Sequence, residues 1–146
     1  MLRAGTRVEL ETPVGWVESR QGTRWVYRGP AGQELMLSAS LVEGTGSDTE
    51  RQKAEETLLA RTLLLAREAA SREGLVNVTP LRRDDAVAEL PCWSFASESR
   101  EKNVGFLGAV VWTMGGVLLA TLEGPLGDEL LATFRQFLGS IRRPTR

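Results

Sequence analysis

The sequence predicts an α+β fold, a three-layer α/β/α sandwich with a largely antiparallel sheet, a long central helix and a C-terminal helix. Residues 104–122 form an uncharged stretch of strand-forming residues interrupted by a glycine pair. Two amphipathic helix patterns, at 48–73 and 128–141, follow other strand-like segments. Strands that are apolar on both faces belong in a sheet that is covered on both sides, and the two helices supply that cover.

The central stretch predicts a β-hairpin, although 19 uncharged residues could span a bilayer by length alone. We place the turn at Met114-Gly115-Gly116, because glycines supply the positive φ angles of tight turns. The first strand has two apolar faces, one with Val104, Phe106, Val110 and Trp112, the other with Leu107, Ala109 and Val111. In the second strand, Val117 and Leu119 oppose Leu118, Ala120 and Leu122.

The N-terminal segment predicts a meander of short strands. Val8–Leu10 is a first strand, and Trp16–Ser19 and Arg24–Arg28 form a hairpin around Gln21-Gly22. Residues 35–42 alternate between two faces and predict a longer strand.

A long helix is predicted from Asp48 to Glu73. Ser47 and Glu50 fit a capping box at its start, and Gly74 is expected to stop it. Its expected apolar stripe comprises Ala54, Leu58, Leu65 and Ala69, widened by Leu64 and Ala66.

The second half predicts more strands and the last helix. We expect a short strand at Val76–Val78 that ends before Pro80, a charged turn at Arg82–Asp85, and an extended segment at Ala86–Ser97. Asp128 is expected to cap the last helix, which Arg142-Arg143-Pro144 ends. Its apolar residues recur at helical spacing: Leu130, Leu131, Phe134, Phe137, Leu138 and Ile141.

Composition indicates one soluble globular domain over residues 1–146. Hydrophobic residues make up 42% and charged residues 25%, and the net charge of −1 predicts no nucleic-acid partner. Cys92 is the sole cysteine, so no intrachain disulfide can form. The first ten residues do not resemble a signal peptide, and we expect a cytoplasmic protein without a stable membrane span.

The chain contains no histidine. This excludes the nucleophile–histidine triads and the usual zinc ligand sets. We therefore predict a protein that is not an enzyme, with no catalytic residues, no metal site and no cofactor.

The order of elements resembles the PsbP-like α/β/α sandwich family. A short strand runs into a Pro13-Val14-Gly15-Trp16 turn, and the last helix ends in a Phe-x-x-Phe-Leu-x-Ser-Ile pattern at 134–141. The family includes the photosystem II extrinsic protein, a Ran-binding nuclear import factor, small bacterial lipoproteins and the Eag-type chaperones of type VI secretion effectors. The resemblance implies a protein that binds other proteins without a catalytic residue set. A lipobox cysteine, which the lipoprotein branch requires, is absent near the start.

Several local patterns carry little weight as sites. Residues 44–49 lack the glycines and lysine of a phosphate loop, and the sequon at Asn77–Thr79 is a frequent chance match. Asp84-Asp85 and Glu55-Glu56 are adjacent carboxylates, which diverge in direction, so we expect solvated surface. Cys92 is expected to be a half-buried structural thiol.

The aromatic residues are the strongest positive signal for a site. Core packing is the ordinary role of each, but Trp and Tyr also dominate binding interfaces. Trp25 and Tyr27 share a strand face and are flanked by Arg24 and Arg28, and Trp93 is a further aromatic candidate. We predict that these five residues bind a protein partner.

The sequence thus predicts a non-enzymatic bacterial protein-binding module, with a secretion-associated adaptor or chaperone as the specific form. A carrier of a small apolar ligand, held between sheet and helix, is the alternative. An enzyme that uses only carboxylates, Tyr or Arg comes third. Homodimer formation stays open.

Overall fold

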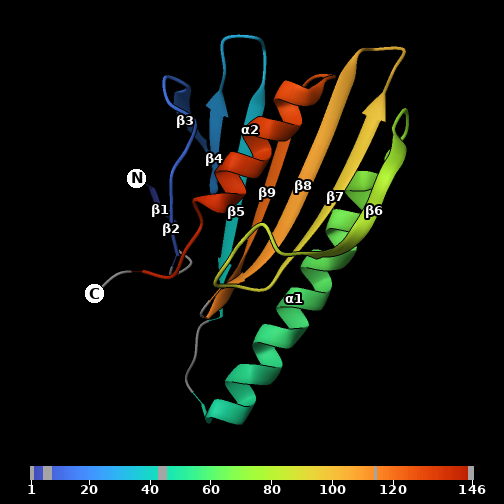
Figure 1. Ribbon diagram of the computed structural model, residues 1–146. Coiled ribbons are helices and arrows are strands. Elements are labelled where there is room, and N and C mark those ends of the chain that lie inside the picture. Colours follow the sequence, from blue (N-terminus) through green and yellow to red (C-terminus); the bar gives the residue numbers. More distant parts are fainter. Residues whose placement is uncertain (1, 5–7, 43–45, 114, 145–146) are drawn as a thin grey trace.

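The computed structural model describes residues 2–4, 8–42, 46–113 and 115–144. A seven-stranded antiparallel sheet carries helix α1 (Asp48–Ala70) on one face and α2 (Asp128–Gly139) on the other (Figure 1). The strands run in the order β3 (Val17–Gln21), β4 (Arg24–Arg28), β5 (Glu34–Leu41), β9 (Gly116–Pro125), β8 (Val104–Thr113), β7 (Cys92–Ser99) and β6 (Val76–Asp84). This confirms the α/β/α sandwich. No helix in the described part of the chain is long and apolar enough to cross a membrane.

The β8–β9 hairpin lies in the middle of the sheet, as predicted. Gly115 adopts a φ of +87°, which its turn position requires, while Met114 lies outside the described residues. Val110 pairs with Leu119 and faces α1, whereas Val111 pairs with Leu118 and faces α2. Both predicted face assignments are therefore correct.

The stripe predicted for α1 is wrong in part. Leu64 and Leu65 are each 53% exposed, whereas the buried residues of the helix are Leu59, Thr62, Ala66 and Ala70. Small side chains let α1 lie close to the sheet, and Phe95 and Phe106 of the sheet supply the bulk of this core.

The helix ends differ from the predicted ones. Ser47 Oγ accepts a hydrogen bond from the Glu50 N–H at 3.2 Å, as expected, but α1 ends at Ala70 rather than near Gly74. In α2 the N-cap residue is Gly127 without a side-chain cap, so Asp128 is the first helical residue instead of the cap. The helix ends at Gly139, ahead of Arg142.

Strand β6 is longer than predicted and continues through Pro80 to Asp84. An edge strand tolerates the missing proline N–H, and the register against β7 shifts on both sides of Thr79. The predicted charged turn is therefore strand for most of its length. Residues 85–91 form a loop instead, so the predicted extended segment begins at Cys92.

Residues 8–10 and the C-terminal segment around Arg142 lie side by side (Figure 1). The predicted strand β2 (Val8–Leu10) is present, and it pairs with an unpredicted strand, β1 (Leu2–Ala4), in a separate two-stranded sheet. Glu9 and Arg142 exchange two backbone hydrogen bonds of 2.9 Å, which join the C-terminal segment to β2.

Candidate functional site

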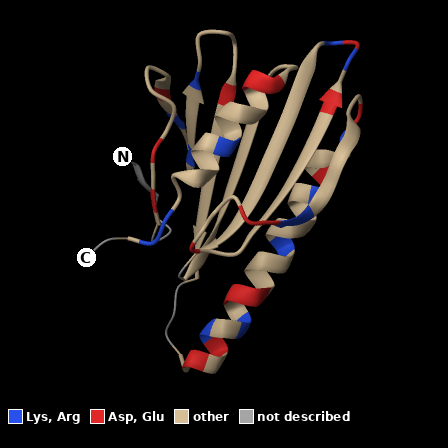
Figure 2. Cartoon of the chain, viewed as in Figure 1, with Lys and Arg blue, Asp and Glu red and all other residues tan. Residues whose placement is uncertain are grey.

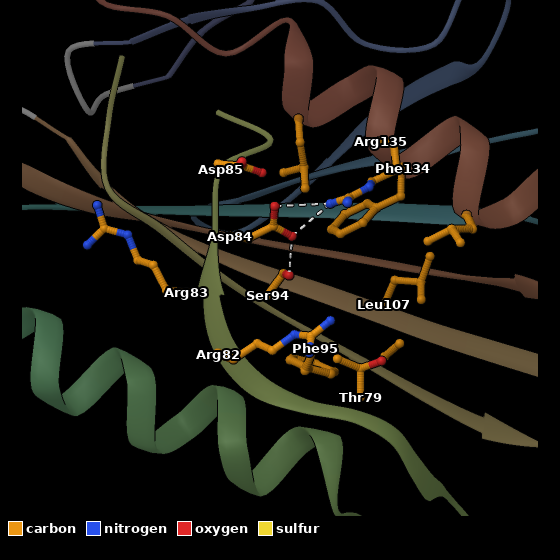
Figure 3. A pocket seen from close by; sticks show the side chains of 13 residues that line it. Thr79, Arg82, Arg83, Asp84, Asp85, Ser94, Phe95, Leu107, Phe134 and Arg135 are labelled. Carbon is orange, nitrogen blue, oxygen red and sulfur yellow. Dashed lines mark hydrogen bonds and ion pairs between the residues drawn. The ribbon is translucent and has the colours of Figure 1, made fainter. Parts of the chain in front are cut away.

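An open cleft lies between α2 and the β6 edge of the sheet (Figure 3). Helix α2 packs mainly against β8 and β9, so part of the same face of β7 and β6 stays open beside it. The cleft has a volume of about 630 Å³. Its apolar lining comes from the sheet and from α2, and comprises Phe95, Ala96, Leu107, Leu131, Phe134 and Leu138. We call this feature the β6–α2 cleft.

The polar wall of the cleft is built by β6. Arg82 pairs with Ser94, and Asp84 pairs with Cys92, whose side chain belongs to the core beneath α2. Alternation along the strands therefore turns Arg82 and Asp84 toward the cleft. Arg83 points to the opposite face, where its guanidinium lies 5.0 Å from the ring centre of Trp93.

The Asp84 side chain connects β6 to helix α2 and to the neighbouring strand β7. Arg135 Nη1 of α2 donates to Oδ1 at 3.0 Å and to Oδ2 at 2.8 Å (Figure 3). The Ser94 hydroxyl also donates to Oδ2, and the Ala86 N–H donates to Oδ1 at 2.8 Å. The Asp84 side chain is only 11% exposed, so this carboxylate is saturated with donors from three elements.

These contacts set the protonation of Asp84. Burial raises the pKa of the carboxyl group, but the hydrogen bonds from Ser94 and Ala86 and the charge of Arg135 outweigh it. The pKa of Asp84 therefore lies below its ordinary value. The expectation that Asp84 is solvated surface is wrong, because the strand turns it inward toward Arg135.

The remaining charges give the cleft two unlike ends. In Figure 3, Arg82 and Thr79 lie on one side of the Asp84–Arg135 pair, and Asp85 lies on the other. Arg82 is exposed, and its guanidinium forms no hydrogen bond or ion pair within the described part of the chain.

The structure does not bring the five predicted partner-binding residues onto one surface. Tyr27 is buried in the core beneath α2, with its hydroxyl donating to Glu18 Oε1 at 2.8 Å, and half-buried Trp25 packs against the same core. Burial and the nearby Glu18 carboxylate raise the pKa of Tyr27. Neither side chain is a freely exposed anchor.

The other three predicted residues lie elsewhere. Arg24 and Arg28 alternate with Trp25 and Tyr27 along β4 and so occupy the opposite sheet face. Arg28 Nε lies 3.4 Å from Glu34 Oε2, and Trp93 packs against the core beneath α1. A role of these residues in binding stays a prediction.

The weaker candidates have structural roles where they are described. Cys92 is fully buried, more than the half-buried thiol we expected, and burial raises its pKa to about 12. Glu55 Oε1 accepts a hydrogen bond from the Gly115 N–H at 2.9 Å, so it is not simply solvated. Asn77 donates to Ser71 Oγ at 3.1 Å. Residues 44 and 45 of the glycine-containing loop lie outside the described residues.

Sequence reasoning missed the β6–α2 cleft because its walls are distant in the chain. Asp84 and Arg135 are separated by 51 positions and belong to no motif. The only available signal was an arginine within an apolar helix pattern, facing the same way as Leu131 and Leu138.

No family model matches the chain, and no curated protein matches its sequence. Among solved structures, the chain is similar to LpqN, which is involved in cell envelope biogenesis of Mycobacterium tuberculosis. The identity is 14% and the TM-score 0.50, over 94% of this chain and 83% of LpqN. It is also similar to a mutant of the protein Mog1, with 8% identity and a TM-score of 0.51, over 94% of this chain and 90% of that one. At these identities the likeness supports the α/β/α fold alone.

Proposed function

We propose that this chain is a non-enzymatic, PsbP-like protein-binding module, and that the β6–α2 cleft receives an extended segment of its partner. One observation carries the proposal, namely an open cleft of about 630 Å³ with an apolar floor and charged walls. Apolar lining with a few placed polar groups is the usual composition of binding sites.

The cleft is held in shape before anything binds. The Asp84 carboxylate ties β6 to α2 through Arg135 and to β7 through Ser94. A preformed site loses less conformational entropy on binding than a flexible one. The charged groups at its two ends suit a polypeptide segment, whose side chains can meet them at different positions.

The specific form of this function follows from the family resemblance. We propose a secretion-associated adaptor or chaperone acting in a bacterial cytoplasm, as the likeness to the Eag-type chaperones of type VI secretion implies. A carrier of a small apolar ligand is the second candidate, since the cleft volume falls within the range of small-molecule sites.

Photo-crosslinking at matched positions tests the proposal. Leu131 lines the cleft and is 48% exposed, while Leu64 on the outer side of α1 is 53% exposed. A photoreactive amino acid at position 131, in the protein's own host, is expected to capture a polypeptide that the same residue at 64 does not. Equal capture at both positions, or none at 131, would contradict the proposal.

Native mass spectrometry of protein purified from the host separates the two candidates. A co-purifying polypeptide that is lost in Leu131→Glu supports the binding module. A small apolar mass lost in the same variant supports the carrier.

A further inference from the structure

We infer that the β6–α2 cleft selects a partner segment in which an acidic residue neighbours apolar ones, and that Arg82 recognises the carboxylate. This inference rests on the proposed function and adds the chemistry of the partner. Arg82 would be a specificity-determining residue of the cleft.

Arg82 is free to take such a role. The nearest carboxylate along β6, that of Asp84, already accepts from Ala86, Ser94 and Arg135, so it has little capacity left to neutralise Arg82. A guanidinium without a partner can donate two parallel hydrogen bonds to a carboxylate. Thr79 lies at the same end of the cleft and carries a hydroxyl as a further donor (Figure 3).

The arrangement of charges also fixes which end of the cleft receives the acidic group. Asp85 occupies the opposite end of the cleft and would repel an acidic group there. Between the two ends lie apolar side chains, among them Leu107 and Phe134. An acidic residue is therefore expected beside Arg82, with the adjoining apolar residues over the floor.

Arg82 and Arg135 differ in what they do. Arg135 is fixed by Asp84 and holds the cleft together, so its removal would change the wall itself. The Arg82 side chain bonds to no other described residue, so its replacement should leave the fold intact. Only Arg82 can thus test recognition without disturbing the site.

Selection from a random 12-residue peptide library, displayed on phage and probed with the full-length protein, tests the inference. Peptides that bind wild type but not Leu131→Gln, a substitution in the cleft that adds no charge, are taken as cleft-dependent. We expect them to be enriched in Asp or Glu next to apolar residues. Arg82→Gln should weaken a selected acidic peptide by about tenfold or more, and Arg82→Glu should shift the enrichment toward Lys and Arg. Unchanged melting temperatures would show that both variants keep the fold.

The possible results separate this inference from the proposed function. Cleft-dependent peptides without acidic enrichment, or with affinity indifferent to Arg82→Gln, would overturn the inference and leave the binding module standing. A library without cleft-dependent peptides would overturn both. Dodecanoate serves as the probe for a small apolar ligand. If it binds the cleft and no peptide does, both proposals are overturned and the small-ligand carrier is favoured.

Discussion

The two helices cover the sheet in different ways. Helix α2 has 12 residues and buries large side chains, namely Leu130, Phe134, Phe137 and Leu138. Helix α1 has 23 residues but buries mostly small ones, and it packs against β6, β7, β8 and β9. Charged residues occur along its length (Figure 2), and all of them except Glu55 are exposed. The short helix with bulky side chains packs mainly against β8 and β9. The opening beside β6 therefore lies on its face of the sheet. The long helix α1 thus covers its face of the sheet out to β6. The shorter α2 leaves the β6–α2 cleft open on the other face.

The largest expected loss of stability comes from a charge placed in the core between the sheet and α2. Val111 is fully buried in β8 beneath α2, so Val111→Asp would place an unpaired charge in that core. The cost of several kcal/mol is a large share of the stability of a domain, and we expect the variant to unfold. Thermal denaturation checks this. An unchanged melting temperature would show that this strand is not central to the fold.

Removing the predicted aromatic anchors should also damage the core. Tyr27→Ala is expected to cost about 3–5 kcal/mol, comparable with Phe134→Ala, because both side chains are buried in the core between α2 and the sheet. Trp25→Ala should lower the free energy of unfolding by less, because the Trp25 side chain is only half-buried. Denaturant titration of the three variants measures these differences. A Tyr27→Ala protein as stable as wild type would restore Tyr27 as a surface anchor.

The close packing of α1 predicts a penalty for added bulk. Ala66 is fully buried against the sheet, so Ala66→Leu should destabilise the protein by about 1–3 kcal/mol through overpacking. Ala60→Leu, at an exposed position on the same helix, is the matched control and should have little effect. Equal stabilities of the two variants would mean that α1 does not lie close to the sheet.

The Asp84 network predicts a smaller effect that depends on pH. Asp84→Asn loses the ion pair with Arg135 and should cost about 1–2 kcal/mol at neutral pH. Because the folded-state pKa lies below the ordinary 3.8, this advantage of wild type is present above that value. It disappears as the pH falls through the lowered pKa.

Urea titrations of both proteins between pH 7 and pH 2 measure that difference. Glu34→Gln serves as control, because the Arg28–Glu34 pair is solvent-exposed and should contribute less than about 1 kcal/mol. A difference between wild type and Asp84→Asn that persists at the lowest pH would contradict the assigned ionisation.

Short sequence patterns predicted the hairpin at the centre of the sheet. They did not predict the buried face of α1, the length of the edge strand β6 or the cleft. The glycine pair and two apolar faces identified the β8–β9 hairpin, because turn geometry and burial act within a few residues. The buried face of α1 was misjudged, since Thr62 and Ala70 rank low in hydrophobicity yet pack where space is smallest. Pro80 and the charges after it concealed the length of β6, which only its position at the sheet edge allows. The cleft arises from how far α2 reaches across the sheet, a tertiary property without a local signal.

Nuclear magnetic resonance mapping of a selected peptide on the isotope-labelled protein tests the central claim most directly. The account predicts that amide shifts concentrate around the β6–α2 cleft, at residues such as Thr79, Arg82, Ala96, Leu107 and Leu131. They should be absent from β3 and β4. Shifts that centre instead on Trp25 and its neighbours Arg24 and Arg28 would contradict the account and place the binding surface at the opposite end of the sheet.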